Sequence, residues 1–154
     1  MKHVLSFVPI LLILFNCSAQ KNATGQSGIS GRVLWLEGNL MPSISDTSYS
    51  KRAQGTPKQK TVYIYEATQR HQVVASESGS IYKDISSRLI TKTKTDKSGY
   101  FKVNLQPGKY SIFIQEDEGL FANIFDGQGI INPVTVEAGK FTDIVIKVNY
   151  KAVY

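Results

Sequence analysis

The sequence is poor in the residues that build disulfides, metal centres and catalytic sites. Its 154 residues include one cysteine and two histidines. One cysteine excludes an intramolecular disulfide. The histidines are His3 and His71, and we predict that His3 is removed with the N-terminal leader, so no pair remains for a histidine-based zinc site. Charged residues are 19% of the chain and the net charge is +6, with the basic residues scattered. A nucleic-acid binder gathers its charge in a patch or stripe, so we predict no nucleic-acid partner.

The chain also lacks an apolar run long enough to span a bilayer. The longest apolar run, VLSFVPILLILF, is twelve residues long and covers Val4 to Phe15, whereas a membrane-spanning helix needs about 20 residues. A short basic start precedes this run and small polar residues follow it, which is typical of a secretory signal peptide. We therefore interpret residues 1–16 as a signal peptide.

The single cysteine, Cys17, directly follows the apolar run in the segment LFNCSAQK. This segment resembles the lipobox of bacterial lipoproteins, with Leu14 at the position three before the cysteine. The resemblance implies that Cys17 is lipidated and becomes the first mature residue, so that the protein is anchored to a membrane. We predict an outer-membrane lipoprotein that faces the periplasm. The alternative is ordinary cleavage near Ala19, which would release a soluble secreted protein.

Residues 17–28, after the signal peptide, are small and polar and read as a flexible tether. Residues 29–154 are dominated by the period-two alternation of β-strands, and no convincing helical period appears. The predicted inward residues, strand by strand, are Ile29, Val33 and Trp35; Val62 and Ile64; Phe101, Val103 and Leu105; Tyr110, Ile112 and Ile114; and Ile144, Ile146, Val148 and Tyr150.

Three further segments complete the predicted organisation of one domain, residues 29–154. A short strand begins at Pro133, where proline is tolerated. The segment RLITKTKTD, beginning at Arg88, alternates lysine and threonine and reads as a solvated edge strand. Residues 41–60 read as a polar loop, and residues 68–87 as an insert with a strand and one helical turn. About seven short strands separated by turn signals predict an antiparallel β-sandwich.

The glycines of TDKSGYFKVNLQPGKYSIFI, residues 95–114, read as corners between strands rather than as a phosphate loop. Asp96 can accept from the backbone two residues on, and Gly99 can supply a positive φ, which predicts a tight hairpin turn. Pro107 and Gly108 fit the central positions of a type II turn. Tyr110 follows at the spacing of a tyrosine corner, so its ring should be buried and its hydroxyl bonded to nearby backbone.

This pattern, preceded by ISGRVLW and TVYIYEA, resembles the carboxypeptidase regulatory-like domain. The resemblance covers residue 29 to about residue 150, and the segment GLFANIFDGQGIINPVTVEAG is similar to a lipoprotein-type subgroup from the Bacteroidetes. It implies a transthyretin-like, seven-stranded, antiparallel Greek-key β-sandwich. It also implies an accessory domain without catalysis of its own.

The residues of the predicted mature chain support no catalytic or metal site. His71 stands alone, and no nucleophile elbow such as G-x-S-x-G is present. The acidic run of residues 116–118 could help to hold a calcium ion, but it lacks the regular spacing of dedicated calcium loops. We therefore predict no enzyme activity, no metal and no cofactor.

The remaining candidates for binding are aromatic residues, namely Trp35, Tyr63, Tyr65 and Phe113. On an exposed face they would bind a sugar or a protein partner. The competing interpretation is that the inserts cover them and make a second small core. We predict a non-catalytic, envelope-anchored module that binds a protein partner or stabilises an assembly. The alternative is a carbohydrate-binding module of the starch-binding type, whose ligand would be an envelope polysaccharide.

Overall fold

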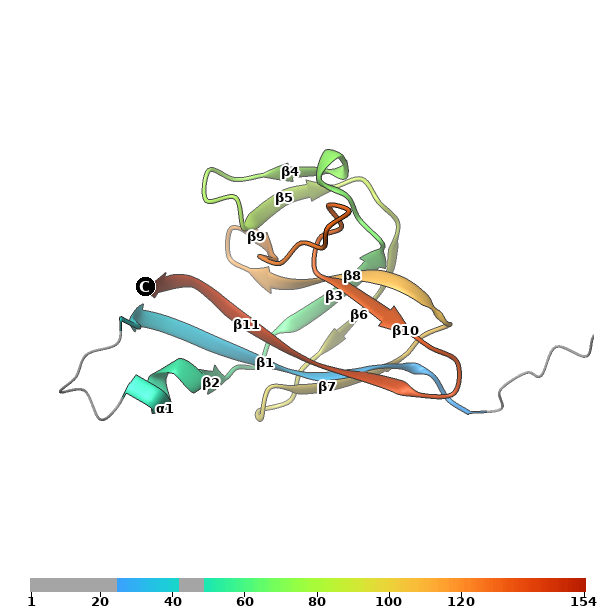
Figure 1. Cartoon of the computed structure of the whole chain (residues 1–154), viewed down its shortest axis with the longest axis horizontal. Helices are drawn as coiled ribbons and strands as arrows, with labels where there is room; N and C mark the ends of the chain where they lie inside the picture. The colour runs from blue at the N-terminus through green and yellow to red at the C-terminus, as the bar shows by residue number, and fades with distance from the viewer. Residues whose placement is uncertain (1–24, 42–48) are drawn as a thin grey trace, which may run out of the picture.

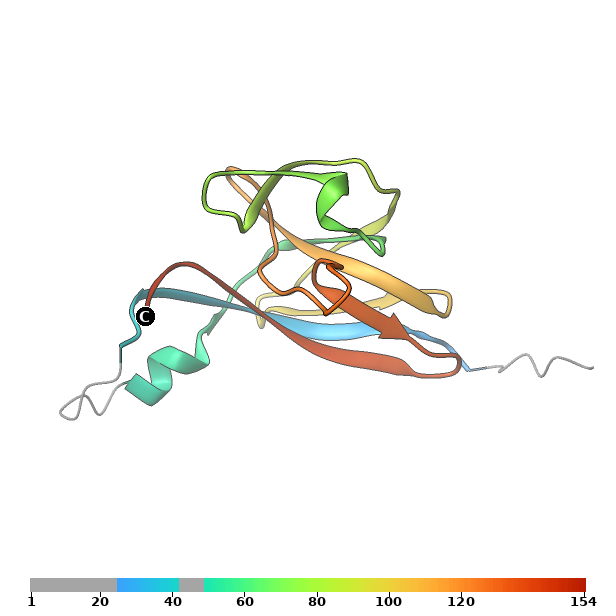
Figure 2. The ribbon, with the colours of Figure 1, turned by 45° about the horizontal axis from the view of Figure 1, so that its top comes forward.

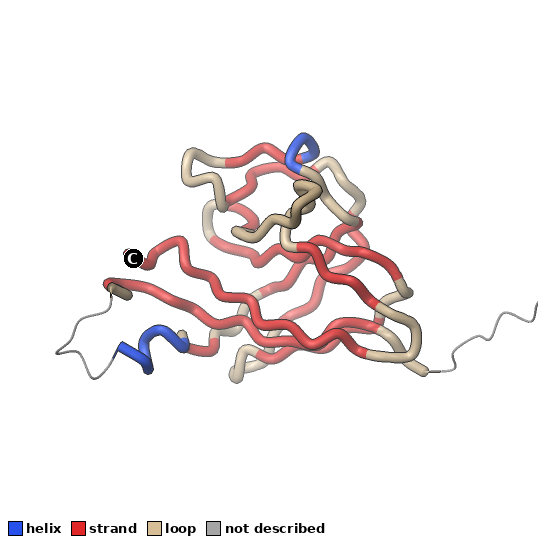
Figure 3. The backbone as a smooth tube through the Cα atoms, in the orientation of Figure 1, coloured by secondary structure: helices blue, strands red, loops and turns tan. Residues whose placement is uncertain are grey.

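The computed structural model describes residues 25–41 and 49–154. The predicted signal peptide and the lipidation site Cys17 lie outside the described residues. The chain is almost entirely β-structure (Figures 1 and 3). In chain order the elements are β1 Gly28–Asn39, α1 Tyr49–Gln54, β2 Thr56–Pro57, β3 Thr61–Glu66, the 3₁₀ turn η1 Arg70–Gln72, β4 Val73–Ala75, β5 Ile81–Ile85, β6 Leu89–Lys94, β7 Tyr100–Asn104, β8 Gly108–Glu116, β9 Gly119–Phe121, β10 Pro133–Val136 and β11 Phe141–Val153.

The strands form two sheets, which confirms the all-β prediction. The smaller sheet has the order β11-β1-β2, with β7 also pairing with β1. The larger sheet has the order β4-β5-β9-β8-β3-β6, with β10 pairing with β8. The edge position predicted for the lysine-rich segment is confirmed, because β6 ends this sheet. No helix in the described part of the chain is long and apolar enough to cross a membrane.

The pairing of β1 with β11 differs from the antiparallel arrangement that the sequence analysis predicts. These two strands run parallel, and their inward residues are in register, with Val33 opposite Ile146 and Trp35 opposite Val148. Parallel neighbours need a long connection, and here the connection is nearly the whole domain. Alternation within each strand predicts its inward face but carries no information about the direction of its neighbour, so the parallel pair could not be predicted.

Two segments contain more structure than predicted. The predicted polar loop of residues 41–60 contains the short helix α1 and the two-residue strand β2. The insert of residues 68–87 contains two strands, β4 and β5, rather than one, together with the η1 turn. The described residues therefore form eleven strands, against the seven predicted. Strands of two or three residues are too short to show an alternation in the sequence.

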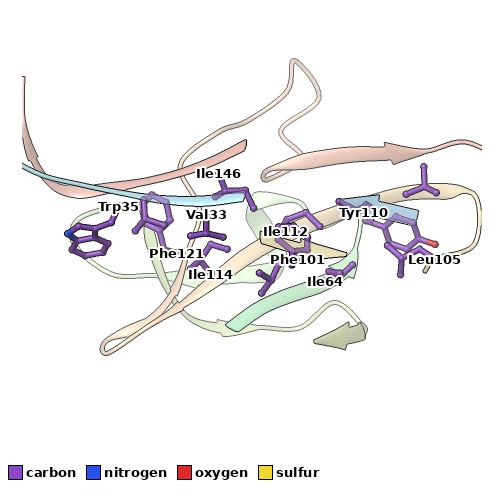
Figure 4. Close-up of a cluster of buried hydrophobic side chains, with 14 of the residues drawn as sticks. Val33, Trp35, Ile64, Phe101, Leu105, Tyr110, Ile112, Ile114, Phe121 and Ile146 are labelled. Atoms are coloured by element: carbon purple, nitrogen blue, oxygen red, sulfur yellow. The ribbon is translucent and has the colours of Figure 1, made fainter. Parts of the chain in front are cut away.

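The main apolar cluster lies between the two sheets and contains the inward residues that alternation predicts. Phe101, Phe121, Ile112, Ile114 and Val33 are all at most 2% exposed. Figure 4 shows these side chains in a row, with Trp35 at one end and Tyr110 with Leu105 at the other. The hydroxyl of Tyr110 donates a hydrogen bond of 2.8 Å to the backbone carbonyl of Gln106. The tyrosine corner is therefore confirmed in both burial and hydrogen bonding.

The turn at Asp96 and Gly99 forms as predicted, but it joins two different sheets. One carboxylate oxygen of Asp96 accepts from the backbone N–H groups of Ser98 and Tyr100, at 2.8 and 2.9 Å. Gly99 has a φ of +72°. The turn connects β6, in the larger sheet, to β7, in the smaller sheet, so it is a corner of the sandwich rather than a hairpin.

The type II turn predicted at Pro107 and Gly108 is wrong. Gly108 is not among the glycines with positive φ; it is the first residue of β8 and pairs with Val136. The prediction failed because Pro-Gly suits a type II turn but does not require one. Here the chain bends at Pro107 and then extends directly into the strand.

Because Gly99 has a positive φ and Gly108 does not, the two glycines should respond differently to substitution. Gly99→Val should lower the free energy of unfolding by more than about 1 kcal/mol, because a β-branched residue is strained at positive φ. A Cβ at Gly99 would also lie 2.5 Å from the Val33 carbonyl oxygen. Gly108→Val is the control, because a Cβ there meets nothing closer than 3.4 Å. Urea denaturation of both variants measures the difference, and equal losses would contradict this account of the turns.

Candidate functional site

The structure does not bring the four predicted aromatic residues together on one surface. Trp35 is 9% exposed and belongs to the main cluster between the sheets. Phe113 is fully buried on the opposite face of the larger sheet. Tyr63 and Tyr65 are half-buried beside Phe113. Trp35 is therefore separated from the other three by the larger sheet itself.

A second apolar cluster under the insert explains the burial of Phe113, as the competing interpretation predicts. The ring of Phe113 makes edge-on contacts with Tyr65 and Tyr82, with ring centroids 5.5 and 5.6 Å apart. Tyr82 belongs to β5, so the insert supplies part of the cover. Ala122 and Ile131 complete the buried part of this cluster.

Tyr63 and Tyr65 also line a polar groove of about 460 Å³ beside the insert. The hydroxyl of Tyr63 lies 3.5 Å from the side-chain oxygen of Gln115. Burial is the main cause that raises the pKa of Tyr65, followed by the nearby charges of Tyr63 and Asp84. The groove therefore combines two partly exposed phenol rings with hydrogen-bonding groups, which is a chemistry that suits a polar ligand.

A buried carboxylate lies at the end of β8, where the sequence shows only an acidic run. Glu116 continues the inward alternation of Ile112 and Ile114, and its side chain is 2% exposed. One of its oxygens, Oε2, accepts from the Lys60 ammonium at 2.8 Å and from the Tyr150 hydroxyl at 3.0 Å. Its other oxygen, Oε1, is buried without a hydrogen-bond partner. The inward position could have identified Glu116, but its partners, Lys60 just before β3 and Tyr150 on β11, are too distant in sequence to infer.

Aromatic rings enclose this ion pair at the Trp35 end of the main cluster. The Lys60 ammonium lies 5.1 Å from the centre of the Trp35 ring, and the Trp35 and Tyr150 rings meet edge-on at 5.5 Å. The Trp35 indole N–H donates to Glu37 at 2.8 Å. Lys60 and Tyr150 bind the same oxygen of Glu116, which joins β8 to β11 and to the residue just before β3. Lys60, Glu116 and Tyr150 together form a polar latch that connects the two sheets.

The Tyr150 hydroxyl is held in its neutral form. Its pKa is raised to about 12, first by burial, then by the hydrogen bond to Glu116, and then by the negative charges of residues 116–118. A phenol with this pKa stays protonated near neutral pH, so it serves as a hydrogen-bond donor rather than as a base or nucleophile. Within the described residues, no group of three or more His, Cys, Asp or Glu side chains could hold a metal ion.

The raised pKa predicts a loss of stability in alkali. An unfolded tyrosine ionises near pH 10, so between about pH 10 and 12 the folded state holds a proton that the unfolded state releases. The stabilisation is complete below pH 10 and is lost as the pH rises to about 12. Burial also raises the pKa of Tyr65 and Tyr82, which adds to the same fall. Tyr150→Phe should show a shallower fall in urea unfolding over this range, and equal slopes would contradict the assignment.

A small apolar cleft lies on the side of the sandwich where β10 and β11 meet. Its volume is about 190 Å³, and it is lined by Ile112 and Val134 of the larger sheet and Ile144 and Ile146 of the smaller sheet. Ile124, in the loop after β9, is 59% exposed at its rim. Val145, 57% exposed, also lines the cleft, so apolar surface continues from the cleft onto the exterior of the molecule.

Two strand edges flank this cleft. In the described part of the chain, β11 pairs only with β1 and β10 only with β8. Each strand therefore has one edge without a paired neighbour, and β11 is thirteen residues long. Asn123 donates to the side chain of Asn149 at 2.7 Å, which holds the loop containing Ile124 beside β11. A free edge beside an apolar cleft can pair with an added strand and accept its side chains.

Comparison of the chain with protein-family models and with curated proteins finds no match to either. The two sheets are consistent with the sandwich that the family resemblance implies, but many unrelated proteins share that architecture. The family therefore stays a prediction.

Proposed function

We propose that this protein is a non-catalytic, envelope-anchored β-sandwich module that binds a protein partner. The observation that carries this proposal is the apolar cleft between the free edges of β10 and β11. The partner would add an extended segment along β11 and place apolar side chains over Ile144 and Ile146. Backbone hydrogen bonds would supply affinity, and the cleft would supply specificity. The proposal includes the transthyretin-like Greek-key fold of the carboxypeptidase regulatory-like domain.

The chemistry of the described residues supports a binding role rather than a catalytic one. The most deeply buried charged group, Glu116, is engaged by Lys60 and Tyr150. His71, the one histidine in the described residues, is exposed in η1. General acid–base or nucleophilic catalysis needs a positioned pair of groups that face a substrate. Instead, the Glu116 side chain is 2% exposed and lies in the interior of the fold, where it accepts from both groups.

Pull-down from detergent-solubilised envelopes tests the cleft directly. Ile124→Glu places a charge at its rim, whereas Val74→Glu is a matched control on β4, where Val74 is 56% exposed. We expect the same partner with the wild type and with Val74→Glu, and its loss with Ile124→Glu. Equal recovery by all three proteins would show that the cleft is not the binding site.

The anchoring part of the proposal rests on Cys17 and predicts a change of location. Cys17→Ala should move the protein from the membrane fraction to the soluble fraction, because several acyl chains together provide stable anchoring, at about 0.8 kcal/mol per buried CH₂. Cell fractionation followed by immunoblotting measures this change. A wild-type mature protein whose N-terminus follows Ala19 would instead support the secreted alternative.

Carbohydrate binding is the second candidate, and the groove lined by Tyr63 and Tyr65 favours it. Titration calorimetry with envelope polysaccharides tests this alternative, with Tyr65→Ala as the variant. Saturable heat that disappears in Tyr65→Ala, without loss of folding, would assign the module to sugars. Among the described residues, Trp35 and Phe113 are buried, so they do not extend this groove into a wider aromatic platform.

A further inference from the structure

The outer face of the smaller sheet, turned away from the main cluster, gathers basic residues that are far apart in the sequence. Arg32 of β1, Lys102 of β7 and Lys147 of β11 are all exposed there. In Figures 1 and 2 this sheet forms one side of the molecule, with α1 at the end near β2. At the end near β2, α1 reaches this face, and the exposed Lys147 ammonium donates to the Ala53 carbonyl oxygen at 3.4 Å.

The strand register places these cations on neighbouring rows of the same face. Ser30 pairs with Lys102 on one side and with Asp143 on the other. In the next row Arg32 pairs with Tyr100 and Val145, and further along Leu34 pairs with Lys147. Paired residues on adjacent strands project from the same side of a sheet. The three cations therefore share one surface.

Little negative charge opposes these cations. Across the rows from Ser30 to Leu34, Asp143 is the single carboxylate, and it accepts a hydrogen bond of 3.0 Å from the Ser30 hydroxyl. The Asp96 carboxylate, near Arg32, accepts its hydrogen bonds from Ser98 and Tyr100. The Lys102 ammonium lies over the Phe141 ring, at 4.1 Å from its centre, so the contact that is shown for it is with a neutral ring.

We propose that this face docks on a membrane surface that carries anionic headgroups. Cations that share one face of a sheet complement such a surface, whose negative potential attracts basic residues within a Debye length. Tyr100 and Val145, 38% and 57% exposed, lie among the cations and can enter the headgroup region. The described chain also enters the fold through β1 of this same sheet. The proposal does not depend on lipidation of Cys17, and its face meets the apolar cleft at Val145 and Lys147, which also line that cleft.

Each of the three cations should increase the affinity of the protein for anionic vesicles. Each basic residue near an anionic surface strengthens binding about fivefold at moderate ionic strength. Removal of all three cations should therefore weaken binding by on the order of a hundredfold. Addition of salt should reduce the affinity of the wild type in the same direction.

Vesicle co-sedimentation tests the proposal on the chain from Ser18 onward, which contains both sheets and both apolar clusters but no lipidation site. The vesicles contain phosphatidylcholine with or without phosphatidylglycerol. The test variant is Arg32→Gln, Lys102→Gln and Lys147→Gln combined. The control combines Lys83→Gln, Lys92→Gln and Lys94→Gln, exposed lysines of the larger sheet, and removes the same charge. Circular dichroism melts verify that both variants fold.

We expect the wild type and the control to bind the anionic vesicles, and the test variant to lose that binding. Equal losses in both variants would overturn the proposal, because net charge alone would then explain the binding. Equal binding of the wild type to neutral and anionic vesicles would also overturn it. Binding to an anionic polysaccharide or to DNA, but not to vesicles, would assign the face to another partner and reject the membrane.

Discussion

Tyr110→Ala should lower the free energy of unfolding by about 3–5 kcal/mol, and Tyr110→Phe by about 0.5–2 kcal/mol. The ring is 9% exposed within the main cluster, so its removal leaves a cavity as well as lost apolar contact. The hydroxyl donates to the Gln106 carbonyl at 2.8 Å, so Phe leaves that acceptor without its partner. Urea denaturation of the two variants separates the ring's contribution from that of the hydroxyl.

The control for this prediction is Tyr100→Ala, because Tyr100 is 38% exposed on the outer face of the smaller sheet. Its loss should be about 1 kcal/mol or less, because the ring is partly exposed and Ala keeps the backbone N–H that donates to Asp96. Tyr110 also borders an open groove with Leu105 and Pro107, so a ligand role is the rival reading. A near-zero loss for Tyr110→Ala would support that rival and contradict the assigned inward face.

Lys60→Met should lower the free energy of unfolding by about 3 kcal/mol, because it leaves the buried Glu116 carboxylate without its cation. The value is at the lower end of the range for buried pairs, since the Lys60 side chain is 23% exposed and water already screens part of the attraction. Chemical denaturation at neutral pH measures the loss. The Tyr150 hydroxyl would remain as a donor to the isolated carboxylate.

The double variant Lys60→Met with Glu116→Leu distinguishes this latch from ordinary packing. Replacing both charges with apolar groups removes the unpaired carboxylate and the unpartnered Oε1 together, so the double variant should be more stable than Lys60→Met alone. The same set of single and double variants of the surface pair Arg88 and Glu66, with side chains 71% and 49% exposed, provides the comparison with an exposed ion pair. If the losses of Lys60→Met and Glu116→Leu simply add in the double variant, the two side chains do not interact, and this would contradict the latch.

The alternation of apolar and polar residues along each strand predicted correctly which side chains point into the core. The inward placement of Val33, Ile112 and Ile114 followed from a period of two, and the structure buries all three. Tyr110 could be predicted as a tyrosine corner because that geometry is local and is encoded in the spacing after Pro107. Gly108 was assigned to the wrong turn because a dipeptide permits several conformations and the neighbouring strand selects one.

The candidate sites could not be predicted because they join segments that are distant in sequence. Lys60 and Glu116 are 56 residues apart, and Tyr150 is a further 34 residues along the chain. The cleft and the basic face both depend on the position of β11. Its parallel pairing with β1 cannot be recognised from the sequence of either strand. The scattered charges of the sequence become a basic face only after β7, β1 and β11 are aligned.

Site-specific photo-crosslinking in intact cells tests most directly the claim that the cleft binds a protein. A photoreactive residue replaces Ile124 at the rim of the cleft, and the same residue at Val74 is the control, since the two side chains are similarly exposed, 59% and 56%. We expect one discrete protein adduct from position 124 and none from position 74. No protein adduct from position 124, or the same adduct from both positions, would contradict it.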